Sequence, residues 1–308
     1  MLTLPEFSEQ TRLLVIAPHP DDETIANGLL IQRVRAAGGE VKILLLTAGE
    51  NNPWPQRWLE RRVVIGAADR RRWGARRRDE LALALRQLDV PSQALQVQHW
   101  PDMGVTDVLL DAVSRAVVEL AATISAFCPS IVAMPSIDDR HPDHGAAYVL
   151  TRLALAGQRD APLQLAYLIH GRAAHDRFVD VTGTPAQVAN KFEALNAHHS
   201  QMALSGRRMR RLAGRTERYL QVPPIRQASS NALPWQPSAW LQPLLRLSVV
   251  DRSTAQTWRW SEAPLRRADD GIYHLAPSVE GLTGPCFARL ACVVPSPWIF
   301  DLWGWREL

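Results

Sequence analysis

Short apolar runs alternate with helical patterns through the first 222 residues of the chain. The segments 13–17, 41–46 and 131–134 are apolar almost throughout, as expected for strands buried on both faces of a parallel sheet. Residues 23–37 and 145–156 follow two of these runs with the spacing of helices. This order predicts a Rossmann-like, three-layer α/β fold with a mostly parallel sheet.

The same patterns place the remaining elements of this region. Further strands are expected at 95–100, 163–170 and 219–222, and further helices at 75–88, 107–127 and 184–201. Residues 51–74 are rich in arginine and show no clear period, so we expect an irregular segment. It would form either a lid or anion-binding wall, or a solvated basic segment with some helix.

The chain changes character at Pro223, where a series of prolines indicates a linker. Short apolar runs at 244–250, 272–275 and 287–294 then predict strands. We therefore expect a first domain at 1–222 and a small β-rich extension at 223–308. Seven tryptophans concentrate in the extension, and packing in a small β core is favoured over stacking on sugars; they are Trp235, Trp240, Trp258, Trp260, Trp298, Trp303 and Trp305.

Polar residues follow the first apolar run directly. His19, Asp21 and Asp22 lie between that strand and its helix, where ligands bind in sheets of this kind. Imidazole and carboxylate groups are ordinary zinc ligands. Two adjacent carboxylates can have separate roles: one binds the metal, and the other accepts a proton from water. The alternative is that one aspartate caps the helix.

A second strand end carries the same residue types. His141 and His144 follow the run at 131–134, and a helix is predicted after them. His144 would be a third metal ligand and His141 a second imidazole nearby. As turn and first-turn residues they could also be structural, but the coincidence of two such motifs favours a metal site.

Together these residues resemble a known family. Pro18-His-Pro-Asp-Asp-Glu23 with His141-Pro-Asp-His144 is similar to the PIG-L/LmbE family of zinc-dependent de-N-acetylases, over roughly residues 10–205. The family includes GlcNAc-phosphatidylinositol de-N-acetylases and bacterial enzymes of mycothiol and bacillithiol synthesis. The resemblance implies one Zn²⁺ bound by His19, Asp22 and His144, with Asp21 as general base and His141 stabilising the oxyanion. Other divalent metals could substitute.

The resemblance also implies substrate contacts. Arg77, in Arg77-Arg-Asp-Glu80, would contact the sugar, and Arg78 is an alternative candidate for this contact. The structural alternative is that the arginine and the glutamate form a charge pair on the helix surface. Asp102 would bind sugar hydroxyls, or else be a turn or cap residue.

Two more residues are expected behind the ligands. Asp139 could hold the imidazole of His141 in one orientation. His198 belongs to a segment, Lys191–Gln201, that resembles the closing motif of the family. It would lie behind the metal or be a buried, hydrogen-bonded histidine.

Composition limits the remaining possibilities. The net charge is +4, and only Lys42 and Lys191 are lysines, so arginine runs are weak evidence for a partner such as nucleic acid. No run reaches the roughly 20 apolar residues of a membrane span, and the N-terminus does not resemble a secretory signal. Three scattered cysteines predict buried thiols and a cytoplasmic location.

The expected function is zinc-dependent removal of the N-acetyl group from an N-acetylhexosamine unit of an anionic or conjugated glycan. A metal-dependent phosphoesterase and a non-catalytic glycan- or nucleotide-binding module are the alternatives. The sequence leaves the exact sugar and the oligomeric state open.

Overall fold

The computed structural model describes residues 4–156, 158, 160–171, 178–224, 231–276, 285–294 and 299–308. The chain divides into two compact units. Unit 1 comprises residues 1–105, 126–136 and 162–222, and unit 2 comprises residues 106–125, 137–161 and 223–308. The boundary expected between residues 222 and 223 stays a prediction.

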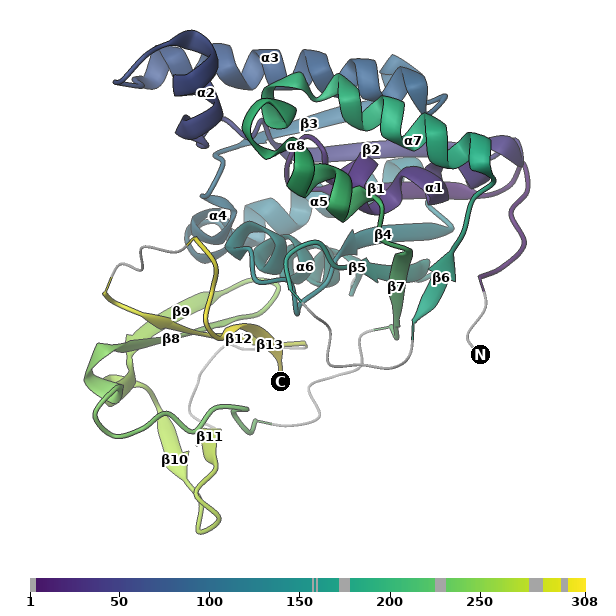
Figure 1. Cartoon of the computed structure of the whole chain (residues 1–308). Helices are drawn as coiled ribbons and strands as arrows, with labels where there is room; N and C mark the ends of the chain where they lie inside the picture. Colours follow the sequence, from purple (N-terminus) through teal and green to yellow (C-terminus); the bar gives the residue numbers. More distant parts are fainter. Residues whose placement is uncertain are drawn as a thin grey trace. The chain divides into compact units, whose positions relative to one another are not determined.

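Unit 1 is built on a seven-stranded sheet in the order β3-β2-β1-β4-β5-β7-β6 (Figure 1). Its strands are β1 (Arg12–Ala17), β2 (Glu40–Thr47), β3 (Leu95–Trp100), β4 (Ile131–Pro135), β5 (Leu163–Tyr167), β6 (Val179–Val181) and β7 (Glu217–Val222). The first five strands pair in parallel, whereas β7 and β6 form an antiparallel edge. The order β3-β2-β1-β4-β5 is that of a Rossmann sheet. The predicted α/β fold with a mostly parallel sheet is confirmed.

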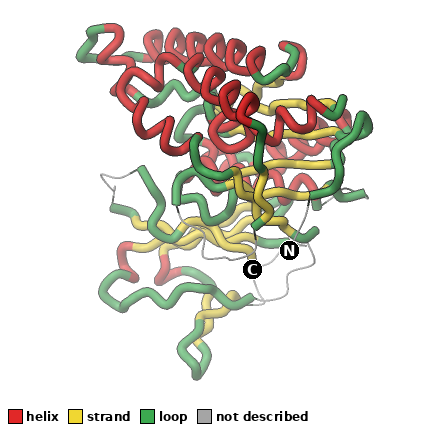
Figure 2. Tube along the Cα trace, turned by 45° about the vertical axis from the view of Figure 1, so that its right-hand side comes forward, coloured by secondary structure: helices red, strands yellow, loops and turns green. Residues whose placement is uncertain are grey.

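Five helices belong to unit 1: α1 (Asp22–Ala36), α2 (Pro53–Glu60), α3 (Ala67–Gln87), α7 (Pro185–Ala197) and α8 (His199–Ala213). Leu13 and Val15 of β1 pack into one core with Leu30 and Val34 of α1. The intervening Leu14 is fully buried as well, which explains why β1 is apolar at every position. Figure 2 shows how the helical segments pack alongside the strands.

The segment 51–74 contains two helices, α2 and the start of α3, joined by the non-helical residues 61–66. The irregular conformation was wrong, whereas the alternative of a basic segment with some helix agrees with the structure. Asn52 caps α2 by accepting a hydrogen bond from the Trp54 amide, and Pro53 provides the first helical residue. α3 begins at Ala67, eight residues earlier than expected, because Asp69 accepts a bond from the amide of Gly66. Arginine is a good helix former, so the charged start of α3 does not oppose a helix.

Two long predicted helices are each divided in two. The helix expected at 107–127 is α4 (Val105–Asp111) followed by α5 (Val113–Phe127). The helix expected at 184–201 ends at Ala197, and α8 begins at His199. His198 lies at the junction, with non-helical backbone angles.

Unit 2 contains α4, most of α5, α6 (Pro142–Leu155) and an antiparallel sheet in the order β13-β12-β8-β9. The strands are β8 (Leu245–Val250), β9 (Ala255–Arg259), β12 (Phe287–Cys292) and β13 (Gly304–Glu307), with a separate hairpin of β10 (Leu265–Arg267) and β11 (Tyr273–Leu275). Short 3₁₀ turns occupy Ser92–Ala94, Gln242–Leu244 and Trp260–Glu262. The predicted β-rich C-terminal region is confirmed.

Tryptophans of this region contribute to its core. Trp235, Trp260 and Trp305 are buried, as the packing interpretation expects, while Trp240 is exposed. Trp298 lies outside the described residues.

The C-terminal strands pack against α6 within unit 2. Trp305 lies so close to Gly145 that a Cβ atom there would be 3.1 Å from the indole Cδ1. The guanidinium of Arg152 donates to the carbonyl of Pro223 at 2.7 Å and to the carboxylate of Glu307 at 3.3 Å. The C-terminal region therefore supports the helix that begins at the second histidine motif.

The three cysteines are free thiols. Cys286 is buried, and burial together with the nearby charge of Asp251 raises its pKa to about 11. Cys128 and Cys292 are exposed, so the expectation of buried thiols was wrong for these two.

A buried ion pair joins α1, α7 and β7. The ammonium of Lys191 lies 2.6 Å from the carboxylate of Glu217, which also accepts hydrogen bonds from the amides of Leu29 and Leu30. Gly28 is required beside it, since a Cβ atom there would be 2.9 Å from Cγ of Lys191. The pKa of Glu217 is raised, because the effect of burial exceeds the lowering by Lys191 and the two amides.

We expect Lys191→Met to destabilise the protein by about 3–5 kcal/mol, because Glu217 would keep its buried charge and lose its cation. Urea unfolding followed by circular dichroism measures this. Arg218→Ala is the matched control, since it removes an exposed pair with Asp180 and should cost less than about 1 kcal/mol. Similar losses in the two variants would contradict the structural role of the buried pair.

Candidate metal centre and active site

The candidate site in unit 1 lies at the carboxyl edge of the sheet. β1 pairs in parallel with β2 and with β4, so the segments after these strands begin at the same edge. His19 to Asp22 follow β1, Gly49 follows β2, and Asp102 follows β3. The fold thus collects residues from three separate segments.

Asp21 has an unusual backbone. Its φ of 118° is a conformation that a residue with a side chain rarely adopts, and this costs of order 1–3 kcal/mol. The amide of Asp21 donates to the carboxylate of Glu23 at 2.9 Å. Although Asp21 occupies the N-cap position of α1, its side chain makes no capping hydrogen bond. The interpretation of this carboxylate as a helix cap is therefore wrong.

Arg77 holds the carboxylate of Asp21 instead. Its guanidinium Nη2 lies 3.2 Å from Oδ2 of Asp21 and 2.6 Å from the carbonyl of Pro20, and Nη1 donates to the carbonyl of Gly49 at 2.7 Å. Gly49 has a φ of 63°, and a Cβ atom on it would be 1.7 Å from Nη1. The contact of Arg77 with a sugar stays a prediction, since the guanidinium here orients Asp21.

The pKa of Asp21 is raised to about 6. Burial is the main cause, Arg77 opposes it, and the neighbouring charge of Asp22 adds to it. A carboxylate with a pKa near neutrality is suited to general base catalysis.

His19 lies between two carboxylates. Its Nδ1 is 3.5 Å from Oδ2 of Asp22, and its Nε2 is 3.2 Å from Oδ1 of Asp102. Asp102 also accepts a hydrogen bond from the amide of Asn51 at 2.7 Å. Burial alone would raise the pKa of Asp102, but the hydrogen bond and charge of His19 with the charge of Arg77 hold it below the usual range. Sugar binding by Asp102 stays a prediction.

His198 packs behind the first turn of α1. Its Nε2 is 3.1 Å from Oε1 of Glu23, whose other oxygen accepts the amide of Asp21. Next to it, Glu80 accepts hydrogen bonds from the amide of Ser200 and so caps α8. His198 is thus a buried, hydrogen-bonded histidine. It contacts Glu23, and its charge lowers the pKa of Asp21.

In unit 2 the second histidine motif begins α6. His141 is the N-cap residue, and its Nδ1 accepts the amide of Asp143 at 3.3 Å. Asp139 accepts the amide of His141 through Oδ1, and its Oδ2 lies 3.1 Å from Nδ1 of His144. The carboxylate therefore lies against the ring of His144 and also binds the backbone of the turn. The orientation of the imidazole of His141 by Asp139 stays a prediction.

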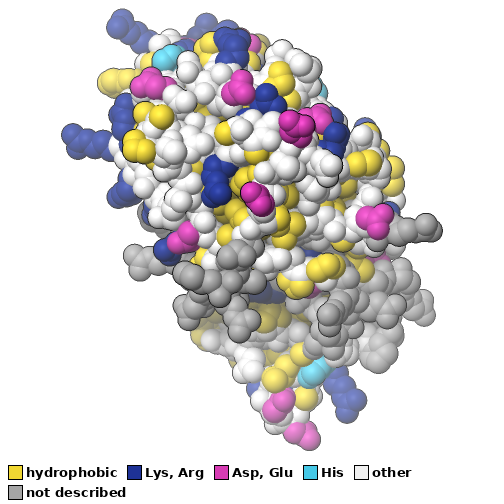
Figure 3. Space-filling view, turned by 90° about the vertical axis from the view of Figure 1, so that its right-hand side faces the viewer, with side chains coloured by type: hydrophobic (Ala, Val, Ile, Leu, Met, Phe, Trp, Pro, Cys, Tyr) yellow, Lys and Arg dark blue, Asp and Glu magenta, His cyan; other side chains and the backbone are white. Residues whose placement is uncertain are grey.

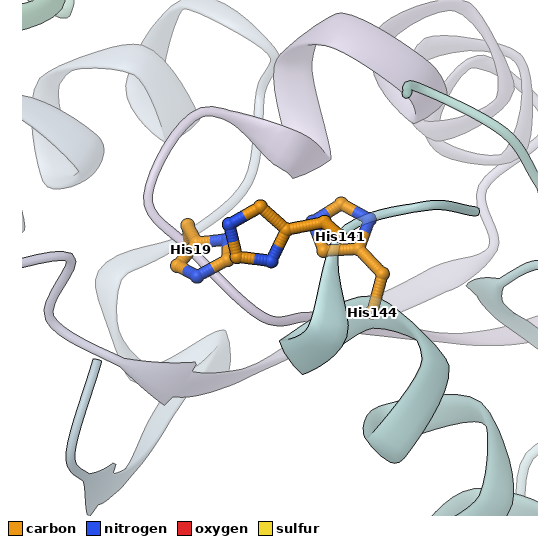
Figure 4. A group of neighbouring side chains, drawn as sticks. All are labelled: His19, His141 and His144. Atoms are coloured by element: carbon orange, nitrogen blue, oxygen red, sulfur yellow. The ribbon is translucent and has the colours of Figure 1, made fainter. Parts of the chain in front are cut away.

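The donor groups fit a divalent cation. Figure 4 shows His19 from the segment after β1, and His141 and His144 from the start of α6. Each unit supplies donors of the kind that bind such an ion: His19 and Asp102 in unit 1, and His141, Asp143 and His144 in unit 2. Imidazole nitrogen and carboxylate oxygen are donors that Zn²⁺ and related ions accept. A carboxylate on Nδ1 of His144 is the usual partner of a ligating histidine.

Sequence reasoning missed two contributors. Glu23 fixes the amide of Asp21 and pairs with His198, and Asp143 belongs to a possible ligand group. Both residues lie inside the quoted motifs, so the motifs could have suggested them. Gly49 could not have been found, because its role depends on the approach of Arg77 from another helix.

Comparison with known proteins agrees with the motifs. Residues 14–155 match the family model described as "PIG-L: GlcNAc-PI de-N-acetylase". The predicted resemblance of this segment to the PIG-L family is confirmed.

A curated relative from Mycobacterium avium (strain 104) is a 1D-myo-inositol 2-acetamido-2-deoxy-alpha-D-glucopyranoside deacetylase. It is 34% identical over 151 residues, which are 45% of this chain and 49% of that protein. The chain therefore spans about half the length of the curated relatives it matches.

Two solved structures share the fold. The N,N'-diacetylchitobiose deacetylase from Pyrococcus horikoshii has a TM-score of 0.54 and 19% identity, covering 69% of this chain and 84% of that chain. The zinc-inhibited form of a teicoplanin deacetylase has a TM-score of 0.52 and 18% identity, covering 63% and 86%. Within the part of this chain that the structure describes, no helix has the length and hydropathy needed to cross a bilayer.

The ion pair of His198 and Glu23 makes a testable prediction about charge. Burial lowers the pKa of His198, but the charge and hydrogen bond of Glu23 outweigh it and the net shift is upward. Glu23→Gln should therefore lower the pKa of His198, as measured by NMR titration of the imidazole. In the wild type, the pair of protonated His198 and Glu23 stabilises the folded state at low pH. This stabilisation is lost as the pH rises through the raised pKa of His198.

Glu193→Gln is the control, since it changes an exposed glutamate on α7. It should leave the pKa of His198 unchanged. An unchanged pKa in Glu23→Gln as well would show that the glutamate is not the source of the shift.

Proposed function

We propose that this chain is a metal-dependent N-deacetylase that hydrolyses the N-acetyl group of an N-acetylhexosamine unit. The observation that carries the proposal is Asp21, a buried carboxylate with a pKa of about 6 that Arg77 holds beside candidate metal ligands. The match of residues 14–155 to a de-N-acetylase family and the names of the relatives support it.

His19, Asp22 and His144 are the proposed ligands of one Zn²⁺ or similar divalent ion. Asp22 lies beside the ring of His19, and Asp139 lies on Nδ1 of His144, as a carboxylate partner of a ligating histidine would. A divalent cation in such a site acts as a Lewis acid toward a carbonyl oxygen and lowers the pKa of a coordinated water.

The remaining chemistry belongs to side chains of this protein. Asp21 accepts a proton as the water oxygen bonds to the acetyl carbon, and returns it to the nitrogen as the C–N bond breaks. The products are acetate and a free amine. Arg77 keeps the carboxylate of Asp21 oriented, and His141 donates to the oxygen that gains negative charge.

We propose an anionic or glycan-conjugated N-acetylated sugar as substrate, with Arg77 and Asp102 as the residues that approach it. The sugar substrates named for the relatives support this choice. A metal-dependent phosphoesterase remains the alternative enzyme. A non-catalytic module is disfavoured, because a binding site does not need a carboxylate with a pKa near neutrality. The cytoplasmic location stays a prediction.

His144→Ala should lose most of its bound metal, because it removes a nitrogen ligand. Equilibrium dialysis against Zn²⁺ followed by elemental analysis measures the ion content per chain. His199→Ala is the control, since this histidine is exposed at the start of α8. Full metal content in His144→Ala would refute the assignment of this ligand.

Asp21→Asn should retain the metal and lose about 10²–10⁴-fold in kcat, the usual effect of removing a general base. Amine release from N-acetylglucosamine and from its phosphate-bearing conjugates measures activity, and phosphate release is followed in parallel. At low salt, the conjugates should react faster than free N-acetylglucosamine. Asp79→Asn, at an exposed position on α3, should be fully active.

Several outcomes would change the proposal. Phosphate release without amine release would favour the phosphoesterase. Equal rates on free and phosphorylated sugars at all salt concentrations would reject the anionic substrate but not the deacetylase activity. Loss of metal in Asp21→Asn would mean that Asp21 is itself a ligand.

A further inference from the structure

Helix α2 and the turn after it expose large apolar side chains. Trp54 is 67% exposed and Trp58 is 66% exposed, and Val63 and Val64 are 85% and 79% exposed. The two tryptophans are four residues apart and so lie on one face of the helix. We call Trp54, Trp58, Leu59, Val63 and Val64 the α2 patch.

The exposure results from a well-anchored helix rather than a frayed one. Pro55 and Gln56 on the opposite side of α2 are buried, and Gln56 donates to the carbonyl of Asp69 at 2.8 Å. Arg61 ends the helix with a φ of 52°. α2 therefore has one face fixed to the protein and one apolar face in solvent.

A positive charge surrounds the α2 patch. Residues 51–72 contain six arginines and two carboxylates, a net charge of +4 that equals the charge of the whole chain. The two carboxylates, Glu60 and Asp69, are already paired with Arg72 and Arg62 at 2.5 and 2.9 Å. The guanidinium of Arg57 stacks over the ring of Trp54 at 5.1 Å.

On the face drawn in Figure 3, acidic and basic side chains are interspersed among the described residues.

We propose that the α2 patch docks this protein on an anionic lipid surface. Tryptophan is enriched at the boundary between lipid and water, and arginine is attracted to anionic headgroups. A short amphipathic helix with an apolar face can lie in that boundary. This inference goes beyond the proposed function and does not depend on it.

Two other occupants fit less well. A soluble polyanion would pair with the arginines but would leave Trp54, Trp58 and the valines in water. A second copy using the same patch would bring two regions of charge +4 together, because a two-fold interface places identical surfaces against each other. A lipid surface satisfies both the charge and the apolar side chains.

The test is sedimentation of the full chain with vesicles. Vesicles of phosphatidylcholine with phosphatidylglycerol should bind the protein, vesicles of phosphatidylcholine alone should not, and salt should weaken binding. The double variants Trp54→Ala/Trp58→Ala and Arg70→Glu/Arg71→Glu should each reduce binding at least about tenfold. Circular dichroism checks that the variants are folded.

Matched controls come from the C-terminal region. Trp240→Ala removes a tryptophan that is 73% exposed, and Arg252→Glu reverses an exposed arginine, so both should bind vesicles like the wild type. Equal binding to neutral and anionic vesicles, or wild-type binding by the patch variants, would overturn the proposal. So would binding to heparin without binding to vesicles, or loss of self-association as the only effect of the tryptophan variant in light scattering.

Discussion

The buried contact between the guanidinium of Arg77 and the carboxylate of Asp21 is the interaction on which the candidate site depends. A carboxylate with this degree of burial is costly to ionise, and Arg77 keeps it in one orientation while opposing the rise of its pKa. The same guanidinium binds the carbonyls of Pro20 and Gly49, so it joins the loops after β1 and β2. The strained backbone of Asp21 persists because these bonds fix the turn on both sides.

Polar pairs in the core explain how the helices around this turn are placed. Glu23 connects the amide of Asp21 to His198, at the junction of α7 and α8. Glu217 connects Lys191 of α7 to the middle of α1. Through these contacts, the segment Lys191–Gln201 holds α1 and the loop before it in place.

The C-terminal region has a corresponding role in unit 2. Trp305 lies against Gly145, and Arg152 binds both Pro223 and Glu307, so α6 and the C-terminal strands share one packed surface. His144 lies in the first turn of that helix, and Asp139 sets the orientation of its ring. Burial of Trp235, Trp260 and Trp305 agrees with packing rather than sugar stacking as the role of these tryptophans.

The sequence by itself determined the sheet and the positions of the candidate site residues along it. Apolar runs such as 13–17 have no other stable position than a doubly buried strand, and His19, Asp21 and His144 follow such strands directly. Tertiary structure decided the partners of these residues. Arg77 approaches Asp21 from α3, Asp102 approaches His19 from the segment after β3, and Asp139 faces Nδ1 of His144. It also revealed the helices in 51–74. The hydrophobic pattern of this segment shows no clear period, but Asn52 and Asp69 bind the backbone amides at the starts of α2 and α3. A partner from a distant segment cannot be read from local periodicity, because only the packing of the elements brings the two groups within hydrogen-bonding distance.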